Sequence, residues 1–213
     1  MRGGSGAIDQ VRFEEGHVDC HVIDRAPAQG ICGSGLVDAI SGLLAAGLIT
    51  ADGRLLTRPE ADGSPYSSRL SEEAFNQFRL TEEQPLSGCR SVVITQKDIR
   101  EVQLAKGAML AGVRILLDVL GLGVEDVREV LLAGAFGNYV RPQSAMGIGL
   151  LPTFPRASIR QVGNAAGGGA QMALLSKRAF KEAGRIADRI EYIDLARVPD
   201  FQQQFIKGMA FPT

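Results

Sequence analysis

The sequence has no tryptophan, and aromatic residues make up only 6% of its 213 residues. Charge of either sign is also not in excess, because 23 Lys and Arg residues are balanced by 24 Asp and Glu residues, for a net charge of −1. Phosphate backbones and anionic membranes attract strongly basic surfaces. We therefore expect neither nucleic acid nor a membrane as a partner.

Long hydrophobic runs are missing as well. Gly, Arg or Asp interrupts every apolar stretch before it reaches the roughly 20 residues that span a bilayer. The N-terminus has no signal-peptide pattern. With 45% hydrophobic residues, the chain can fill a sizeable core. These features predict a globular protein in the cytoplasm.

Cysteine and histidine are too few and too scattered for a metal centre. Cys20, Cys32 and Cys89 are odd in number and lack C-x-x-C spacing, so free thiols are expected. His17 and His21 lie in an alternating strand pattern, which would hold their rings about 13 Å apart. That separation is too large for one metal ion, and surface histidines are the simpler interpretation.

Hydrophobic periodicity predicts an α/β protein. In the first half we expect a hairpin over 8–14 and 17–23, a glycine segment over 30–35 that leads into a helix from Leu36 to Gly47, a mobile surface loop over 57–72, and short strands around 75–80 and 92–94. In the second half we expect strand 127–133, a short helix near 143–149, strand 158–162, a small-residue helix from 164, strand 190–195 and a helix over 198–208. Helix and strand alternate in this half, which favours a mixed, largely parallel sheet with helices on both faces.

The surest element is a long helix that begins after Thr95. Thr95 and Asp98 have the spacing of a capping box, and an apolar period of three to four residues continues to Gly121. One face carries Ile99, Val102, Ala105, Met109, Val113, Leu116, Leu117 and Leu120, which we expect to be buried. The opposite face carries Arg100, Gln103, Lys106 and Gly107, which we expect to be available to solvent or a ligand.

Three glycine-rich segments stand at the ends of predicted elements. Gly134-Ala135-Phe136-Gly137 follows a strand, where ligands bind in open α/β sheets and where glycine permits close approach to the backbone. Val162-Gly163-Asn164-Ala165-Ala166-Gly167-Gly168-Gly169-Ala170 ends a second strand and opens a helix. Gly33-Ser34-Gly35 begins a helix whose free amides attract anions. Tight turns, close helix packing and a plain N-cap by Ser34 are the alternative interpretations.

Several segments together resemble one protein family. They are GICGSGLVDAISGLLAAGLI, ITQKDIREVQLAKGAMLAG, VLLAGAFGNYV, IGLLP, VGNAAGGGA and YIDLARVPDFQQQFIKGMAFP, in that order. This series is similar to the C-terminal part of the ATP-dependent reductive activators of corrinoid proteins. The resemblance implies a ribonuclease H-like lobe of the acetate and sugar kinase/Hsp70/actin superfamily, preceded by a β-hairpin region.

The resemblance also implies a function. Members of the family use ATP, with Mg in the full-length protein, to drive an electron onto cob(II)alamin and restore cob(I)alamin in a corrinoid protein. The [2Fe-2S] ferredoxin domain and the D-x-G-T-N-G phosphate motif of the family have no counterpart in this sequence. We therefore expect a fragment of a larger protein, with negligible ATP hydrolysis of its own. Within it, 1–30 would be the hairpin segment, 31–95 a helix with short hairpins, and 96–213 the α/β lobe.

By resemblance, Gly134, Ala135, Phe136 and Gly137 form the adenosine motif, with Phe136 covering the base. Asn164, Ala165, Ala166 and Gly167 correspond to a small-residue helix that packs against the other lobe. Gln96 and Lys106 match family positions on the long helix. We hypothesise that Lys106 reaches the nucleotide; the alternative is a solvated lysine. No residue is assigned a catalytic role.

A second hypothesis is a docking module of the same fold that binds a corrinoid protein but no nucleotide. Lys177, Lys181 and Arg185 form a basic stripe, which is either the wet face of an amphipathic helix or a surface for an acidic corrinoid protein. A dinucleotide-binding domain is disfavoured because AGAFGNYV does not supply G-x-G-x-x-G. The sequence leaves open whether the domain forms a homodimer and whether Cys32 has a redox role.

Overall fold

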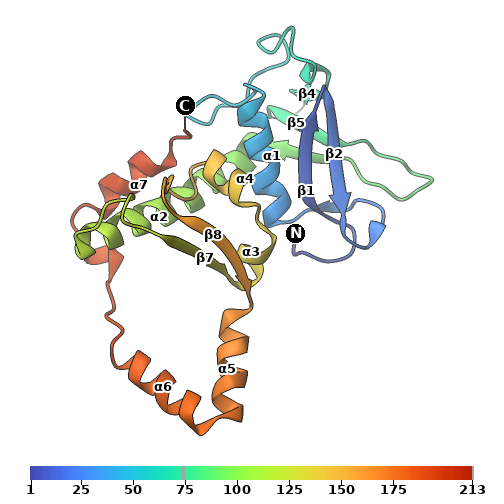
Figure 1. The fold of residues 1–213 in the computed structure, drawn as a ribbon. Helices are drawn as coiled ribbons and strands as arrows, with labels where there is room; N and C mark the ends of the chain where they lie inside the picture. The colour runs from blue at the N-terminus through green and yellow to red at the C-terminus, as the bar shows by residue number, and fades with distance from the viewer. Residues whose placement is uncertain (73–74, 213) are drawn as a thin grey trace.

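The computed structural model describes residues 1–72 and 75–212 of the chain. Within α3, only the backbone of Ala135, Phe136 and Asn138 is described, so the predicted contact of the Phe136 ring lies outside the described side chains. Helices pack around three small sheets, and two helices extend away from the rest (Figure 1).

The strands are β1 (Ala7–Glu14), β2 (His17–Val22), β3 (Gly30–Ile31), β4 (Leu70–Ser71), β5 (Gln77–Thr81), β6 (Val92–Thr95), β7 (Glu129–Ala133) and β8 (Ser158–Gly163). The α-helices are α1 (Gly33–Ala45), α2 (Gln96–Leu120), α3 (Gly134–Tyr139), α4 (Pro142–Gly147), α5 (Ala165–Leu175), α6 (Lys177–Ala187) and α7 (Phe201–Met209). Three 3-10 turns complete the description: η1 (Ile23–Arg25), η2 (Ser67–Arg69) and η3 (Leu195–Arg197).

The predicted hairpin is confirmed as β1 and β2, which pair antiparallel, with β3 adding in parallel beside the start of β1. Helix α1 packs directly against β1. This contact requires glycine at position 35, because a Cβ there would lie 2.4 Å from the carbonyl oxygen of Ile8. One of the three glycine segments thus has a packing role.

Helix α2 begins and ends as predicted. Thr95 and Asp98 form a complete capping box, and Gly121 ends the helix in the left-handed conformation. The prediction of one buried and one solvent-facing side is wrong. Helix α7 lies along the side that carries Gln103, Lys106 and Gly107, and buries all three (Figure 1). Ala105, Met109, Leu116 and Leu120, which were expected inside, are exposed.

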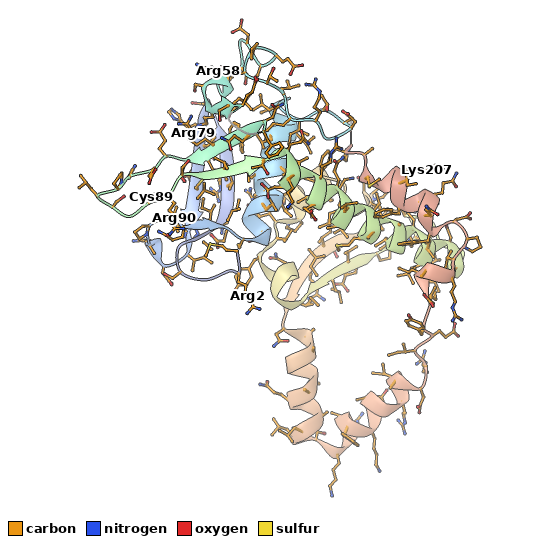
Figure 2. All side chains as sticks on the ribbon, turned by 180° about the vertical axis from the view of Figure 1, so that it is seen from behind. Arg2, Arg58, Arg79, Cys89, Arg90 and Lys207 are labelled. Atoms are coloured by element: carbon orange, nitrogen blue, oxygen red, sulfur yellow. The ribbon has the colours of Figure 1, made fainter. Side chains whose placement is uncertain are left out.

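The predicted surface loop over 57–72 is partly a core segment. Ala61, Tyr66 and Leu70 are buried there. The Tyr66 ring meets Phe13 edge-on at 5.2 Å between centroids. The end of this segment is β4, which forms an antiparallel sheet with β5 and β6. Strands β5 and β6 confirm the two short strands predicted on either side of the Pro85 and Gly88 loop. Cys89 lies on this loop, at the margin of the molecule (Figure 2).

Strands β7 and β8 run parallel as a separate two-stranded sheet. The predicted strand over 190–195 is wrong, because residues 190–194 pair with no strand in the part of the chain that the structure describes, and η3 follows them. Helices α5 and α6 fill the interval between β8 and this segment. They project from the molecule, with side chains that extend into open space (Figures 1 and 2).

Burial divides the chain unevenly. The buried hydrophobic residues lie between Ala7 and Leu151, joined only by Phe211 near the C-terminus. No residue from 152 to 207, a range the structure describes fully, is buried. Among the described residues, no helix has the length and apolar character needed to cross a bilayer.

Candidate functional site

The glycine turns at 134 and 163 lie side by side. Ala133 and Gly163 are partners in the parallel register of β7 and β8, so the two strands end together. Gly134 has φ of 81° and Gly163 has φ of 63°, both in the left-handed region that favours glycine. A Cβ added at either position would meet nothing within 4 Å. Two glycines therefore leave open backbone at the carboxyl end of this sheet.

Close packing and hydrogen bonds hold the elements that follow the two glycine turns in place. Gly137 packs α3 back onto β7, since a Cβ there would lie 3.0 Å from the carbonyl carbon of Leu132. The side-chain amide of Gln161 on β8 donates to the carbonyl oxygens of Gly137 (3.1 Å) and Val140 (2.9 Å). Asn164 caps α5 by accepting from the Gly167 N–H at 2.9 Å. The turn at 134–137 is thus held against both β7 and β8.

A buried ion pair connects this turn to the hairpin. Arg141 follows α3 and donates from Nε to Asp38 Oδ1 at 2.9 Å. Arg141 Nη2 also donates to the Val11 carbonyl at 2.7 Å, while the Val11 N–H donates to Asp38 Oδ2 at 3.3 Å. The Asp38 side chain is only 1% exposed. The pair thus hydrogen-bonds both backbone groups of Val11, which lies on β1 beyond the two residues that pair with β3. Because Arg141 lies between α3 and α4 and Asp38 lies on α1, the pair connects these helices.

The N-terminus of α1 borders a cavity of about 350 Å³ whose accessible lining is mostly apolar but includes charged side chains. Its lining residues are Gly3, Gly4, Asp9, His21, Ile23, Asp24, Cys32, Ser34 and Tyr139. The cavity brings the first turn of α1 together with the last residue of α3. Its volume lies within the range of small-molecule sites, roughly 300–1,000 Å³.

Ser34 does not cap α1, so that alternative is wrong. Cys32 is the N-cap residue and makes no side-chain cap. The Ser34 hydroxyl donates instead to the Asp9 carbonyl at 2.9 Å, and Cys32 Sγ lies 3.4 Å from the same hydroxyl. No side chain therefore caps the α1 amides that face the cavity, the arrangement in which a helix N-terminus favours negative charge.

The cavity also contains residues that sequence reasoning missed. His21 Nδ1 lies 2.6 Å from Asp9 Oδ1, so the carboxylate orients the ring. Tyr139 is largely exposed and borders the cavity from α3. The hairpin register, which sets residue 10 opposite residue 21, brings Asp9 within reach of His21. Within 1–72 and 75–212, no three His, Cys, Asp or Glu side chains gather as metal ligands.

A second hollow borders the other side of α3. It has a volume of about 160 Å³, and every residue that lines it is apolar. The lining includes Ala133 and Gly137 from the glycine turn, Met109 from α2 and Leu131 from β7. The turn at 134–137 therefore borders an apolar hollow directly, whereas α3 reaches the larger cavity at the start of α1 through Tyr139.

Gln96 lies apart from the glycine turns and has a structural role. Its Oε1 accepts from the Leu55 N–H at 2.8 Å, and its Nε2 donates to the Gly53 carbonyl at 2.7 Å. Both polar groups of the side chain are thus used to hold the 53–55 segment against the start of α2. Gln96 as a nucleotide contact stays a prediction.

Lys106 is not a solvated lysine, because its side chain is completely buried. Its Nζ donates to the carbonyls of Gly208 (2.7 Å) and Ala210 (2.5 Å) and lies 5.1 Å from the centroid of the Phe211 ring. Burial, with a further contribution from the Arg114 charge, lowers the pKa of Lys106 to about 8. A contact between Lys106 and a nucleotide, which stays a prediction, would require the 208–211 segment to move.

Known proteins that are similar to this chain all point to one family. The family model described as the C-terminal domain of RACo, the ASKHA domain, matches residues 1–213. The chain belongs to this family. The resemblance inferred from the sequence motifs and the actin-like α/β fold are thereby confirmed.

Individual relatives agree with the family. The corrinoid activation enzyme RamQ of Eubacterium limosum is 38% identical over 213 residues, which are 99% of this chain and 36% of RamQ. The [Co(II) methylated amine-specific corrinoid protein] reductase of Methanosarcina barkeri is 27% identical over 124 residues, which are 57% of this chain and 23% of the reductase. A solved reductive activator for corrinoid, iron-sulfur protein superposes with a TM-score of 0.83 at 34% identity, over 100% of this chain and 33% of the activator. The chain thus spans about a third of the length of RamQ and of the solved activator.

Proposed function

We propose that this chain is the nucleotide-binding portion of an ATP-dependent reductive activator that returns cob(II)alamin in a corrinoid protein to cob(I)alamin. One observation carries the proposal: two left-handed glycines with open space around them lie together where β7 and β8 end, in a member of the ASKHA family. In open α/β sheets, ligands bind beyond this end of the strands.

The residues around the turn suit the two chemically different ends of ATP. The backbone at Gly134 and Gly163 would let an adenosine group approach closely, and the apolar hollow beside Gly137 suits a flat base. The α1 amides at Gly33, Ser34 and Gly35, which no side chain caps, favour the negative charge of phosphates, whereas the Asp9 and Asp24 carboxylates that line the same cavity oppose it. Bound ATP would supply the free energy that drives an electron onto cobalt at low potential.

This chain would bind the nucleotide and transmit that binding to neighbouring elements, and it would not supply the electron. The one electron that converts Co(II) to Co(I) would come from the [2Fe-2S] domain that the resemblance implies. Gln161 and the Asp38–Arg141 pair would transmit nucleotide binding from the turn at 134–137 to β8, β1 and α1, because they join α3 to these elements. The acceptor would be a corrinoid protein.

The competing proposal is a docking module that binds a corrinoid protein without a nucleotide. The observation in its favour is the exposed basic stripe of Lys177, Lys181 and Arg185 on α6. The two proposals differ in whether the open backbone at 134 and 163 holds a ligand.

Asparagine substitutions at these glycines separate the proposals. Asparagine tolerates the left-handed conformation, so Gly134→Asn and Gly163→Asn fill the open space without breaking the turn. We expect each variant of the activator to bind ATP and ADP at least about tenfold more weakly by calorimetry, which corresponds to about 1.4 kcal/mol. ATP-dependent formation of cob(I)alamin should fall with it.

Gly121→Asn is the matched control. Gly121 is also left-handed, with φ of 65°, and also has nothing within 4 Å of an added Cβ, but it ends α2 away from the glycine turns. This variant should bind nucleotide as the unmodified protein does. If all three variants bind nucleotide with unchanged affinity, or if the unmodified protein binds a corrinoid protein and no nucleotide, the proposed site is wrong.

A further inference from the structure

Two free thiols, Cys20 and Cys89, pack against the same hydrophobic core from different parts of the chain. Cys20 lies on β2, and Cys89 closes the turn between β5 and β6 by bridging to Gln84. Both side chains are partly buried. The nucleotide site proposed above uses neither of them.

The strand register places Cys20 on the face of the hairpin that meets the β5–β6 strands. Cys20 lies opposite Val11 on β1. The next pair on the same face is Val18 and Phe13, because side chains alternate between the two faces of a sheet. The Phe13 ring stacks on Phe78 of β5 at 5.7 Å between centroids. Cys20 is therefore one pair of residues along from a direct contact between the two sheets.

Hydrogen bonds on both sides hold Cys89 near the end of the same hairpin. The Gly88 carbonyl accepts from Gln29 Nε2 at 2.7 Å. The Arg90 N–H donates to the Ala28 carbonyl at 2.8 Å. Residues 28 and 29 lie in the short connection from β2 to β3. The backbone on either side of Cys89 is thus fixed to the hairpin that carries Cys20.

The charges around Cys20 agree with this placement. Burial raises the pKa of Cys20 to about 11, with further increases from the charges of Asp19 and Cys89 that the Arg69 charge opposes. The Cys89 thiol therefore lies within the range over which its charge acts on Cys20. Cys32, the third thiol, is buried at the start of α1, 3.4 Å from the Ser34 hydroxyl.

We propose that Cys20 and Cys89 are a site of reversible oxidation, at which a peroxide converts the two thiols to an intramolecular disulfide. The disulfide fastens β2 to the turn between β5 and β6. The site does not depend on nucleotide binding at the glycine turns.

The reaction proceeds in two steps. Cys89 reacts first, because it lies at the margin of the molecule (Figure 2) whereas the Cys20 thiol is almost entirely protonated at neutral pH. The peroxide oxidises Cys89 to a sulfenic acid and releases one water. The Cys20 sulfur then attacks the Cys89 sulfur, and the Cys20 proton leaves with the hydroxyl group as a second water. One peroxide and two thiols thus give one disulfide and two waters, and a thiol reductant reverses the reaction.

The disulfide acts on a strand that also lines the cavity at the start of α1. His21 follows Cys20 on β2, so its side chain lies on the opposite face. There its Nδ1 lies 2.6 Å from Asp9 Oδ1, and both residues line the cavity. Oxidation at Cys20 therefore restrains the strand that positions His21.

Peptide mapping by mass spectrometry tests the pairing. After treatment with an equimolar amount of hydrogen peroxide, the unmodified protein should contain a cross-linked pair of peptides that carry Cys20 and Cys89. Dithiothreitol should remove the link. Cys89→Ser should abolish it, and Cys32→Ser, the matched control at the third thiol, should retain it. Mapping of the unmodified protein decides the pairing even where a variant folds poorly.

Hydrogen exchange tests the restraint. In the oxidised protein, the amides of 84–89 should exchange at least about tenfold more slowly than in the reduced protein, because the turn can no longer open away from β2. The amides of 158–163, on the separate β7–β8 sheet, should be unchanged.

Four results would overturn the proposal. They are oxidation of Cys89 without a cross-link, a cross-link that involves Cys32, a disulfide between two chains, and a Cys20–Cys89 disulfide that leaves exchange at 84–89 unchanged.

Discussion

The chain up to residue 151 and the region from 152 to 207 differ sharply in how much they bury. The first holds nearly the whole hydrophobic core, in which the small sheets and α1 fix one another. The second contains no buried residue, and its helices α5 and α6 contact mainly each other among the described elements. The same residue types therefore carry different consequences in the two regions. Gly35 in the first region is required by neighbouring backbone atoms, whereas Gly168 and Gly169 in the second region face open space.

Ion pairs should show the largest contrast. Asp38→Ala removes a carboxylate that is 1% exposed and leaves the Arg141 guanidinium and the Val11 N–H without their partner. We expect the free energy of unfolding to fall by about 3 kcal/mol, near the lower limit for broken buried pairs because Arg141 reaches solvent. Chemical denaturation measures this loss.

The matched substitution is Glu129→Ala in the β7–β8 sheet, which joins the two regions. Glu129 pairs with Arg160 at 2.6 Å, but both side chains are substantially exposed. Exposed pairs contribute about 0–1 kcal/mol, so the expected loss is small. Equal losses at Asp38 and at Glu129, whose partner Arg160 lies after residue 151, would mean that burial does not separate the two ion pairs as described.

Glycine-to-alanine substitutions in the two regions should change stability in opposite directions. Gly35→Ala forces a Cβ to within 2.4 Å of the Ile8 carbonyl oxygen, and β1 or α1 must shift, at a cost of about 2–3 kcal/mol. Gly168→Ala meets nothing within 4 Å and improves helix propensity by up to about 1 kcal/mol. The melting temperature should therefore fall for Gly35→Ala and stay level or rise for Gly168→Ala. A marked loss of stability in Gly168→Ala would indicate a contact at Gly168 that the described residues do not make.

These glycines also illustrate what the sequence could predict. Local signals succeeded: the Thr95 capping box, the Gly121 terminus, the hairpin and the strands before Gly134 and Gly163 all follow from spacing within a few residues. The sequence also located all three glycine segments.

The failures depend on contacts between residues far apart in the chain. The polar side of α2 is buried because α7, about a hundred residues later, packs on it. The Asp38–Arg141 pair and the position of His21 beside Asp9 likewise arise only when distant segments meet. The segment 190–194 has strand-like composition but no neighbouring strand to complete a ladder.

Lys106 fastens the C-terminal segment to the core. Lys106→Met leaves the Gly208 and Ala210 carbonyls without a donor, and we expect a loss of about 1–2 kcal/mol near pH 7. The buried amine has a pKa of about 8 against an ordinary 10.5, so the unfolded chain binds more protons between these values. Stability of the unmodified protein should therefore rise as pH increases from about 8 to 10.5.

The variant provides the control for this titration. Lys106→Met has no amine at this position, so its free energy of unfolding should lack the rise that Lys106 contributes above pH 8. Denaturation curves at several pH values compare the two proteins. Parallel pH profiles would contradict a buried, titrating Lys106.

Hydrogen exchange with and without ATP or ADP tests the central claim most directly. If nucleotide binds where β7 and β8 end, amides of 134–139, 163–168 and the first turn of α1 should exchange more slowly in its presence. The loop at 53–55 and the segment at 206–211 should be unchanged. Protection confined to those two segments, or none at the glycine turns when nucleotide is bound, would contradict the account.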